Sequence, residues 1–275
     1  MPLFRYRGGE LDLSHRTCIM GILNVTPDSF SDGGRYYDPA AAVARAMDIQ
    51  RQGAGILDIG AQSTRPGHIP VSAEEERERL LPVLEALRGR LTIPISVDTY
   101  YPEVAEAALQ RGVAILNDVS GCLEGSMPEV AARYGAGLIM MHPGIPGEPE
   151  DAVAAVRAYF RWALERAAAA GLPAESVCLD PGIGFGKSRQ GDWQLVARLR
   201  ETMDGLPDAA VLVGASRKRA VGACCGNPPF EQRLAGTLAI HTLAQWNGAH
   251  ILRVHDVAEA VQAAAVTDTL LAAKG

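Results

Sequence analysis

The sequence lacks an excess of positive charge, a long apolar run and an apolar leader, and each absence excludes a class of protein. Its 26 lysine and arginine residues are outnumbered by 32 aspartate and glutamate residues, for a net charge of −6, whereas phosphate binding along a nucleic acid needs a clustered basic face. No apolar run approaches the roughly 18 residues that span a bilayer. A signal peptide has an apolar core of about 7 to 15 residues. The first ten residues hold two arginines and no such core. We therefore expect a cytoplasmic protein with neither a nucleic-acid nor a membrane partner.

The sequence also lacks a cysteine framework. Its five cysteines are an odd number and include no CxxC pair. Cys224 and Cys225 are adjacent and cannot easily form a relaxed disulfide with each other. This pattern is typical of reduced thiols in a cytosolic protein and disfavours a structural zinc site.

Short β-branched runs alternate with Ala-, Leu-, Glu- and Arg-rich stretches of helical periodicity along the whole chain of 275 residues. The strands are predicted at 18–23, 56–59, 95–97, 114–117, 138–141, 177–179, 210–213 and 251–254. The helices are predicted near 39–52, 73–88, 102–111, 128–134, 151–170, 193–203, 229–246 and 257–272. Eight such pairs are the number that a closed (β/α)8 TIM barrel requires.

The length alone would allow two domains or one large α/β unit. Because no linker, low-complexity tract or change in composition interrupts the chain, we expect a single domain over residues 1–275. Residues 1–16 precede the first barrel strand and should form a hairpin or plug at the bottom of the barrel, which then occupies residues 17–275.

Polar side chains follow nearly every predicted strand, at the end where the loops of such a barrel converge. Asp98, Asn117 and Asp180 leave nearby strands at the same height. Taken singly, each could simply cap the next helix. Together they suit a flat, donor-rich heterocycle, because a carboxylate can accept two parallel N–H bonds from an aminopyrimidinone edge.

Two further groups of residues extend this predicted site. Arg253 and His255 are two positions apart at the last strand and should face one way, which indicates an anion site. Asn24, at the end of the neighbouring first strand, could bind a Mg²⁺ ion that this anion also binds, since magnesium prefers hard oxygen ligands. Phe30 and Phe185 would add an aromatic wall for a second substrate.

Four strings in these loops resemble the signatures of dihydropteroate synthases, a family of pterin-binding enzymes. The resemblance runs from Cys18 to His255. The strings are MGILNVTPDSFSDGG from Met20, DIGAQSTRPG from Asp58, LDPGIGFGK from Leu179 and GASRK from Gly214.

The resemblance implies a TIM barrel, usually a homodimer. It implies a transferase that joins 6-hydroxymethyl-7,8-dihydropterin diphosphate to 4-aminobenzoate, giving 7,8-dihydropteroate and diphosphate. The pterin ring would be held by Asp98, Asn117, Asp180 and Lys218. The diphosphate would be held by Asn24, Thr64, Arg253 and His255, with Asn24 also on Mg²⁺. The aminobenzoate site would be framed by Phe30, Thr64, Arg65, Pro66, Phe185, Ser216 and Lys218.

The predicted chemistry follows from these parts. Binding of the diphosphate would make it a better leaving group, so that the C–O bond breaks before the arylamine attacks. Asp28 would stabilise the resulting pterin cation, and with Lys218, Arg253 and His255 it completes the predicted catalytic set. The positive groups Arg65, Lys218, Arg253 and His255 are expected to gather at one rim, against the negative net charge.

Two alternative functions would also use part of this set of residues. A pterin-dependent methyltransferase would also use Asp and Asn at strand ends, but has no use for the diphosphate loop or for an Arg-x-His at the eighth strand. A non-catalytic pterin-binding barrel is disfavoured because all the charged positions are filled.

Overall fold

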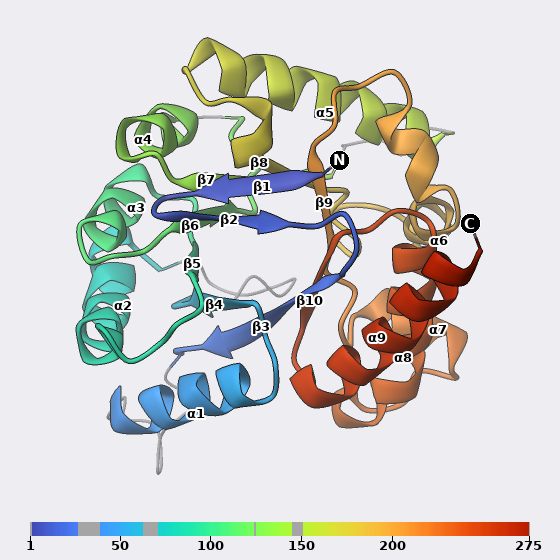
Figure 1. Ribbon diagram of the computed structural model, residues 1–275, viewed down its shortest axis with the longest axis horizontal. Coiled ribbons are helices and arrows are strands. Elements are labelled where there is room, and N and C mark those ends of the chain that lie inside the picture. The colour runs from blue at the N-terminus through green and yellow to red at the C-terminus, as the bar shows by residue number, and fades with distance from the viewer. Residues whose placement is uncertain (1, 27–38, 63–70, 124, 145–150, 275) are drawn as a thin grey trace.

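The computed structural model of the protein is a closed barrel of eight parallel strands with helices around it (Figure 1). It describes residues 2–26, 39–62, 71–123, 125–144 and 151–274. The barrel strands are β3 (Cys18–Asn24), β4 (Ile56–Gly60), β5 (Ile95–Asp98), β6 (Ile115–Asp118), β7 (Gly137–Met141), β8 (Val177–Asp180), β9 (Ala210–Val213) and β10 (Ile251–Val254). Pairing of β10 with β3 closes the ring. The predicted (β/α)8 barrel is confirmed.

Helices follow the strands and pack on the outside of the barrel (Figure 1). They are α1 (Pro39–Arg51), α2 (Ala73–Leu87), α3 (Pro102–Leu109), α4 (Met127–Tyr134), α5 (Ala152–Ala169), α6 (Arg189–Ala197), α7 (Arg219–Cys224), α8 (Leu234–Trp246) and α9 (Val257–Ala273). Helix α2 begins where a capping residue predicts, because the Ser72 hydroxyl accepts a hydrogen bond from the Glu75 backbone N–H at 3.2 Å.

Two helix predictions are wrong in detail. Helix α6 begins at Arg189, four residues earlier than predicted, because the Ser188 hydroxyl caps it by accepting from the Gly191 N–H. The predicted helix at 229–246 begins only at Leu234, after a short 3-10 turn, and the separate helix α7 precedes it. In the turn before α8 the Arg233 guanidinium donates to the carbonyls of Pro228 and Arg217, which holds residues 228–233 outside the helix.

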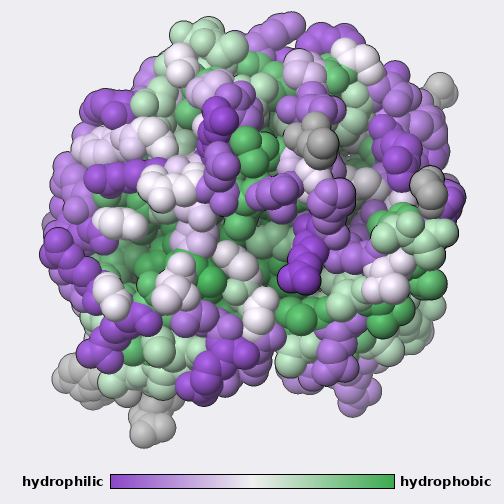
Figure 2. Space-filling view, in the orientation of Figure 1, coloured by the Kyte–Doolittle hydropathy of each residue, from purple (hydrophilic) through white to green (hydrophobic). Residues whose placement is uncertain are grey.

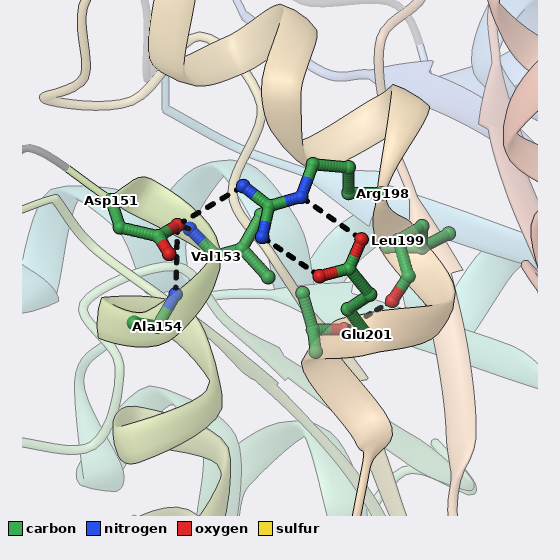
Figure 3. Close-up of polar contacts among 7 residues, drawn as sticks. Asp151, Val153, Ala154, Arg198, Leu199 and Glu201 are labelled. Carbon is green, nitrogen blue, oxygen red and sulfur yellow. Dashed lines mark hydrogen bonds and ion pairs between the residues drawn. The ribbon is translucent and has the colours of Figure 1, made fainter.

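The predicted helix over 193–203 is broken at Arg198, where the backbone leaves helical geometry and a 3-10 helix, Leu199–Met203, follows. The Arg198 guanidinium donates to both carboxylate oxygens of Glu201, at 2.9 and 2.7 Å. It also reaches Asp151 at 3.4 Å, and Asp151 caps α5 by accepting from the backbone N–H groups of Val153 and Ala154 (Figure 3). The break therefore ties α6 to the start of α5.

The predicted N-terminal hairpin is present as the antiparallel strands β1 (Leu3–Tyr6) and β2 (Gly9–Asp12). Figure 1 shows this hairpin lying across one end of the barrel. Phe4 is fully buried and packs in an apolar cluster with barrel residues such as Met20 and Ile139. The hairpin thus closes the barrel at the end opposite the carboxyl ends of its strands.

Replacing Phe4 with alanine should lower the free energy of unfolding by about 3–5 kcal/mol, because it leaves a cavity among fully buried barrel residues. Denaturant unfolding would measure the loss. Phe4→Leu is the matched control and should cost less, since it keeps most of the apolar volume. A change below about 1 kcal/mol for alanine would contradict a plug role for this side chain.

The barrel interior changes from apolar to polar between two successive layers of inward-facing side chains. The layer beside the hairpin contains Ile56, Ile115, Cys178 and Ile251. Side chains two positions apart on a strand face the same way. The next inward positions on the same four strands are Asp58, Asn117, Asp180 and Arg253. The fold therefore places charged and amide groups above an apolar floor, at the carboxyl ends of the strands.

Candidate active site

Arg253 bonds directly to two buried carboxylates. Its Nε donates to Asp58 Oδ2 at 2.7 Å, and a terminal guanidinium nitrogen donates to Asp98 Oδ2 at 2.9 Å. Asp58 Oδ2 also accepts from Asn117 Nδ2 at 3.2 Å. Asp58, Asp98 and Asn117 are all buried. Three of the side chains predicted to hold a heterocycle or an anion, Asp98, Asn117 and Arg253, thus lie in one hydrogen-bonded cluster with Asp58.

The charged groups in this cluster shift one another's pKa values. Burial raises the pKa of Asp98, the Arg253 guanidinium lowers it, and the nearby Asp58 and Asp118 carboxylates raise it. Burial alone would lower the pKa of Arg253, but Asp58 and Asp98 raise it above its ordinary value. Arg253 therefore stays protonated, and two carboxylates face one guanidinium.

Asp180 and Lys218 form the other half of the site. Asp180 Oδ1 accepts from the Gly182 N–H at 2.7 Å. Lys218 Nζ donates to the Ile183 carbonyl at 2.7 Å and lies 4.3 Å from the centroid of the Phe185 ring. Burial lowers the pKa of Lys218 to about 8, while Asp180 raises it and Arg253 lowers it. Burial raises the pKa of Asp180, and Lys218 opposes that shift. The loops after β8 and β9 thus meet where Lys218 bonds to the Ile183 carbonyl, with Asp180 close enough to influence the charge of Lys218.

Lys187 is a second partly buried cation, to which the sequence alone assigned no role. Its Nζ donates to the backbone carbonyls of His142, Gly182 and Phe185 at 3.1, 2.9 and 3.0 Å. Burial lowers its pKa to about 8, and Asp180 raises it. The ammonium group joins the loop after β8 to the end of β7, and so fixes the segment that carries Phe185.

Lys187→Met should destabilise the protein by about 3 kcal/mol or more, because three buried carbonyls lose their donor. Lys274→Met, at the exposed residue that follows α9, is the control and should change little. Denaturant unfolding at several pH values would measure both. The Lys187 pKa is about 8 when folded and near 10.5 when unfolded, so the unfolded chain binds the extra proton between them.

The stability difference between wild type and Lys187→Met should therefore grow in favour of wild type as the pH rises from 8 to 10.5, by up to about 1.4 kcal/mol per pH unit. A difference that does not change with pH would contradict the lowered pKa.

His255 stands at the rim beside Ser216. Its Nδ1 lies 2.9 Å from Ser216 Oγ, which also accepts from the His255 backbone N–H at 3.2 Å. The His255 ring meets the Phe230 ring edge-on, with centroids 5.4 Å apart. Arg253 instead turns to the buried carboxylates, so these two residues, two positions apart, have different partners.

Two other histidines have roles in the backbone framework. His241 Nε2 accepts from the Ala215 N–H at 3.1 Å, and His250 Nδ1 accepts from the Val211 N–H at 3.0 Å. Burial lowers the pKa of His241 to about 3 and that of His250 to about 4, so both accept these bonds as neutral imidazoles. His241 supports the loop that presents Ser216 and Lys218.

Asn24 ends β3 beside Gly60 of β4. A Cβ atom at Gly60 would lie 3.8 Å from Asn24 Oδ1 and 3.7 Å from Asp98 Cβ, so the Asn24 and Asp98 side chains lie on either side of this glycine. Within the described part of the chain, no three His, Cys, Asp or Glu side chains form a group that could hold a metal. A lone amide oxygen suits a Mg²⁺ ion that arrives on a substrate's phosphates, since such ions keep most of their ligands from phosphate and water.

Five predicted site residues lie outside the described residues. They are Asp28, Phe30, Thr64, Arg65 and Pro66.

Asp58 and Lys187 lie within the family signatures, but the sequence alone indicated no role for either of them. A signal for Asp58 was available, because a carboxylate in the middle of a strand with buried neighbours on both sides is rarely placed there unless it is paired. No local signal could reveal the carbonyl partners of Lys187, one of which is 45 residues away in the chain.

A protein-family model described as "Pterin binding enzyme" matches residues 20–255. The dihydropteroate synthase of Escherichia coli (strain K12) is 44% identical, over all of this chain and 98% of that protein. The chain belongs to the dihydropteroate synthase family. The family consists of transferases of folate biosynthesis, so the prediction of an enzyme of this class is confirmed.

Solved dihydropteroate synthases also share the fold. The Xanthomonas albilineans enzyme with 4-aminobenzoic acid has a TM-score of 0.90 and 41% identity, over 98% of each chain. The same enzyme in complex with 7,8-dihydropteroate has a TM-score of 0.87 and 39% identity, covering 98% of this chain and 99% of that one. At this level of identity the family favours the synthase over the methyltransferase and non-catalytic alternatives.

Proposed function

We propose that the protein condenses 6-hydroxymethyl-7,8-dihydropterin diphosphate with 4-aminobenzoate, giving 7,8-dihydropteroate and diphosphate. The observation that carries this proposal is the gathering of Asp98, Asn117, Asp180 and Lys218 at one end of a barrel, in a chain of this family. The complexes of its relatives with 4-aminobenzoic acid and with 7,8-dihydropteroate support the same substrate and product here.

The pterin ring would lie on the apolar floor of the barrel, edge-on to these four side chains. Carboxylates are acceptors and match the amino and ring N–H donors of the pterin, while the Asn117 amide and Lys218 can donate to its ring nitrogens and carbonyl. Because the floor excludes water, each matched hydrogen bond discriminates strongly against other ring systems.

The diphosphate would lie above the ring, toward Arg253, His255 and Asn24, with Thr64 from the second loop. Mg²⁺ held by Asn24 and by the diphosphate itself would neutralise negative charge on the leaving group. Arg253 and His255 donate hydrogen bonds to the same oxygens, and so stabilise the charge that develops on them as the C–O bond breaks.

Bond breaking would take both C–O electrons onto the diphosphate and leave a methylene cation delocalised into the dihydropterin. Asp28 would stabilise this positive charge. The 4-aminobenzoate nitrogen would then attack the methylene carbon and lose a proton after the C–N bond has formed, so no strong general base is needed.

The aminobenzoate would lie against Phe185, Ser216 and Lys218, with Phe30, Thr64, Arg65 and Pro66 completing its site. The contact of Lys218 Nζ with the Phe185 ring supports this arrangement, because an ammonium group above an aromatic face can also approach the carboxylate of an aromatic acid.

The direct test supplies the pterin diphosphate, 4-aminobenzoate and Mg²⁺ to the purified protein and follows diphosphate release. Release that depends on the arylamine, with dihydropteroate formed in equal amount, is the expected result. Release without arylamine would point to hydrolysis. Absence of any release would favour the non-catalytic alternative.

We also propose that the protein is a homodimer formed through its last helices. Large apolar side chains are exposed on α8 and α9: Leu243, Trp246, Val266 and Leu270 are 36–61% exposed. Figure 2 shows hydrophobic surface interrupting the polar surface on the side where Figure 1 places these helices. Large exposed apolar side chains gathered on two packed helices are typical of subunit interfaces.

A charge on this face should separate the subunits. Leu270→Glu would bury an unpaired carboxylate at the interface, so sedimentation should change from dimer to monomer. Leu123→Glu is the control, because Leu123 is equally exposed at 58% but lies after β6, away from α8 and α9. A wild-type monomer at micromolar concentration would refute the dimer.

None of the helices in the described residues combines the length and apolar character needed to cross a bilayer. All five cysteines are free thiols. These thiols support the proposal of a cytoplasmic location.

A further inference from the structure

One carboxylate oxygen connects the two halves of the proposed substrate site. Asp58 Oδ2 accepts from Arg253 Nε, which we place on the diphosphate, and from Asn117 Nδ2, which we place on the pterin ring. Asp58 itself is fully buried, and its Oδ2 is already bonded to both of these neighbours. We place no part of the substrate on Asp58, so its effect on the reaction would pass through them.

The position of Asp58 is fixed by its strand. Its backbone lies in the middle of β4, paired with Ile22 of β3 on one side and Ser96 of β5 on the other. Its side chain cannot swing toward solvent, because the barrel closes around it. A charge-assisted hydrogen bond to a fixed carboxylate restrains a long arginine side chain far more than a bond to water would.

Asp98 cannot supply the same restraint during catalysis. It also binds Arg253, at 2.9 Å, but it belongs to the group that we place on the pterin ring. Donors from a bound ring would compete with Arg253 for the Asp98 oxygens. Asp58, on which we place no part of the substrate, is then the anchor that remains for the guanidinium.

We propose that Asp58 is a positioning residue that couples the pterin subsite to the diphosphate subsite. By holding the Asn117 amide and the Arg253 guanidinium on one oxygen, it makes occupation of either subsite organise the other. This inference rests on the proposed function, since it assumes that the two neighbours touch the two parts of one substrate.

Coupling of this kind is reciprocal and can be measured without turnover. The ring probe is 6-hydroxymethylpterin, and the diphosphate probe is inorganic diphosphate with Mg²⁺. In the wild-type protein each probe should raise the affinity of the other by about 5- to 50-fold in titration calorimetry. Asp58→Asn keeps the shape of the side chain and removes its charge.

In Asp58→Asn we expect the diphosphate affinity to fall about tenfold or more and the mutual enhancement to approach one. Asp118→Asn is the matched control. Asp118 is an equally buried strand-end carboxylate, but within the described part of the chain it accepts only from the nearby Ser120 and Cys122. This control should keep the coupling even if it lowers the melting temperature. If Asp58 had a purely structural role, Asp58→Asn would behave in the same way.

A double variant tests whether Asp58 acts through Arg253. Asp58→Asn should weaken diphosphate binding in the wild-type background but not further in Arg253→Ala, where the group that it positions is gone. It should also raise the melting temperature of Arg253→Ala, because it neutralises a buried carboxylate that has lost its cation. Losses that simply add would overturn the proposal.

If Asp58→Asn does not fold, Arg253→Lys gives the same test. Lysine keeps the charge but lacks the planar guanidinium that spans both carboxylates, so the mutual enhancement should be lost. Enhancement kept at its wild-type size in either variant overturns the coupling role alone. A wild-type protein that binds neither probe overturns the proposed function as well, so the two failures are distinguishable.

Discussion

Arg253→Ala should reduce turnover by about 10²- to 10³-fold, because it removes a donor aimed at the charge that develops on the leaving diphosphate. The binding of 6-hydroxymethylpterin alone should weaken much less. The same change should lower the free energy of unfolding by about 3–5 kcal/mol, since it leaves the Asp58 and Asp98 carboxylates buried without their cation. Steady-state kinetics, calorimetry and denaturant unfolding would measure the three quantities.

Arg198→Ala is the control for this prediction. Arg198 also bonds two carboxylates, those of Glu201 and Asp151, but these pairs lie on the surface and are screened by water. Turnover should stay at the wild-type value. If Arg253→Ala left turnover unchanged after correction for the folded fraction, the assignment of Arg253 to the diphosphate would be wrong.

Asp180→Asn should weaken pterin binding by about 1–3 kcal/mol, or roughly 5- to 150-fold in affinity. The substitution exchanges a carboxylate oxygen for an N–H₂ donor, which faces either the donors of the ring or the Gly182 N–H. Lys218 also loses the charge that counters the effect of burial on its pKa, so that pKa should fall further below 8. Titration of 6-hydroxymethylpterin against pH would measure both effects.

Asp118→Asn serves again as the comparison, since Asp118 ends β6, two strands away from β8, and among the described residues its carboxylate accepts only from its own turn. It should retain wild-type pterin affinity. Equal losses in the two variants would mean that Asp180 supports the barrel and does not bind the ring.

The sequence predicted a rim of positive groups, and the structure shows a more balanced one. Lys218 lies by Asp180, and Arg253 is bonded to two carboxylates. The cations at the strand ends could be identified from the sequence. The pairing of Arg253 with Asp58 could not, because the two residues are 195 positions apart in the chain. We expect the diphosphate to meet a site whose cations are already oriented by carboxylates, at the cost of a weaker net attraction.

The helix boundaries that failed show a related limit. Helix α2 begins at Ala73 as predicted, since its cap, Ser72, acts within three residues of its own position. The break at Arg198 was not predicted, because the Arg198 guanidinium bonds to Asp151, the cap of α5, as well as to nearby Glu201. Local rules find the contacts that are local in sequence.

The sequence by itself determined the barrel, its hairpin and the residues at the strand ends, because strand periodicity, turn residues and family signatures are written in short stretches of chain. Only the tertiary structure decided which of those residues act on each other. Closing the ring brings β4, β6 and β10 to face one interior, where Asp58 can hold Asn117 and Arg253 on a single oxygen. That meeting depends on the barrel's register and on burial, which strengthens the bonds by excluding water.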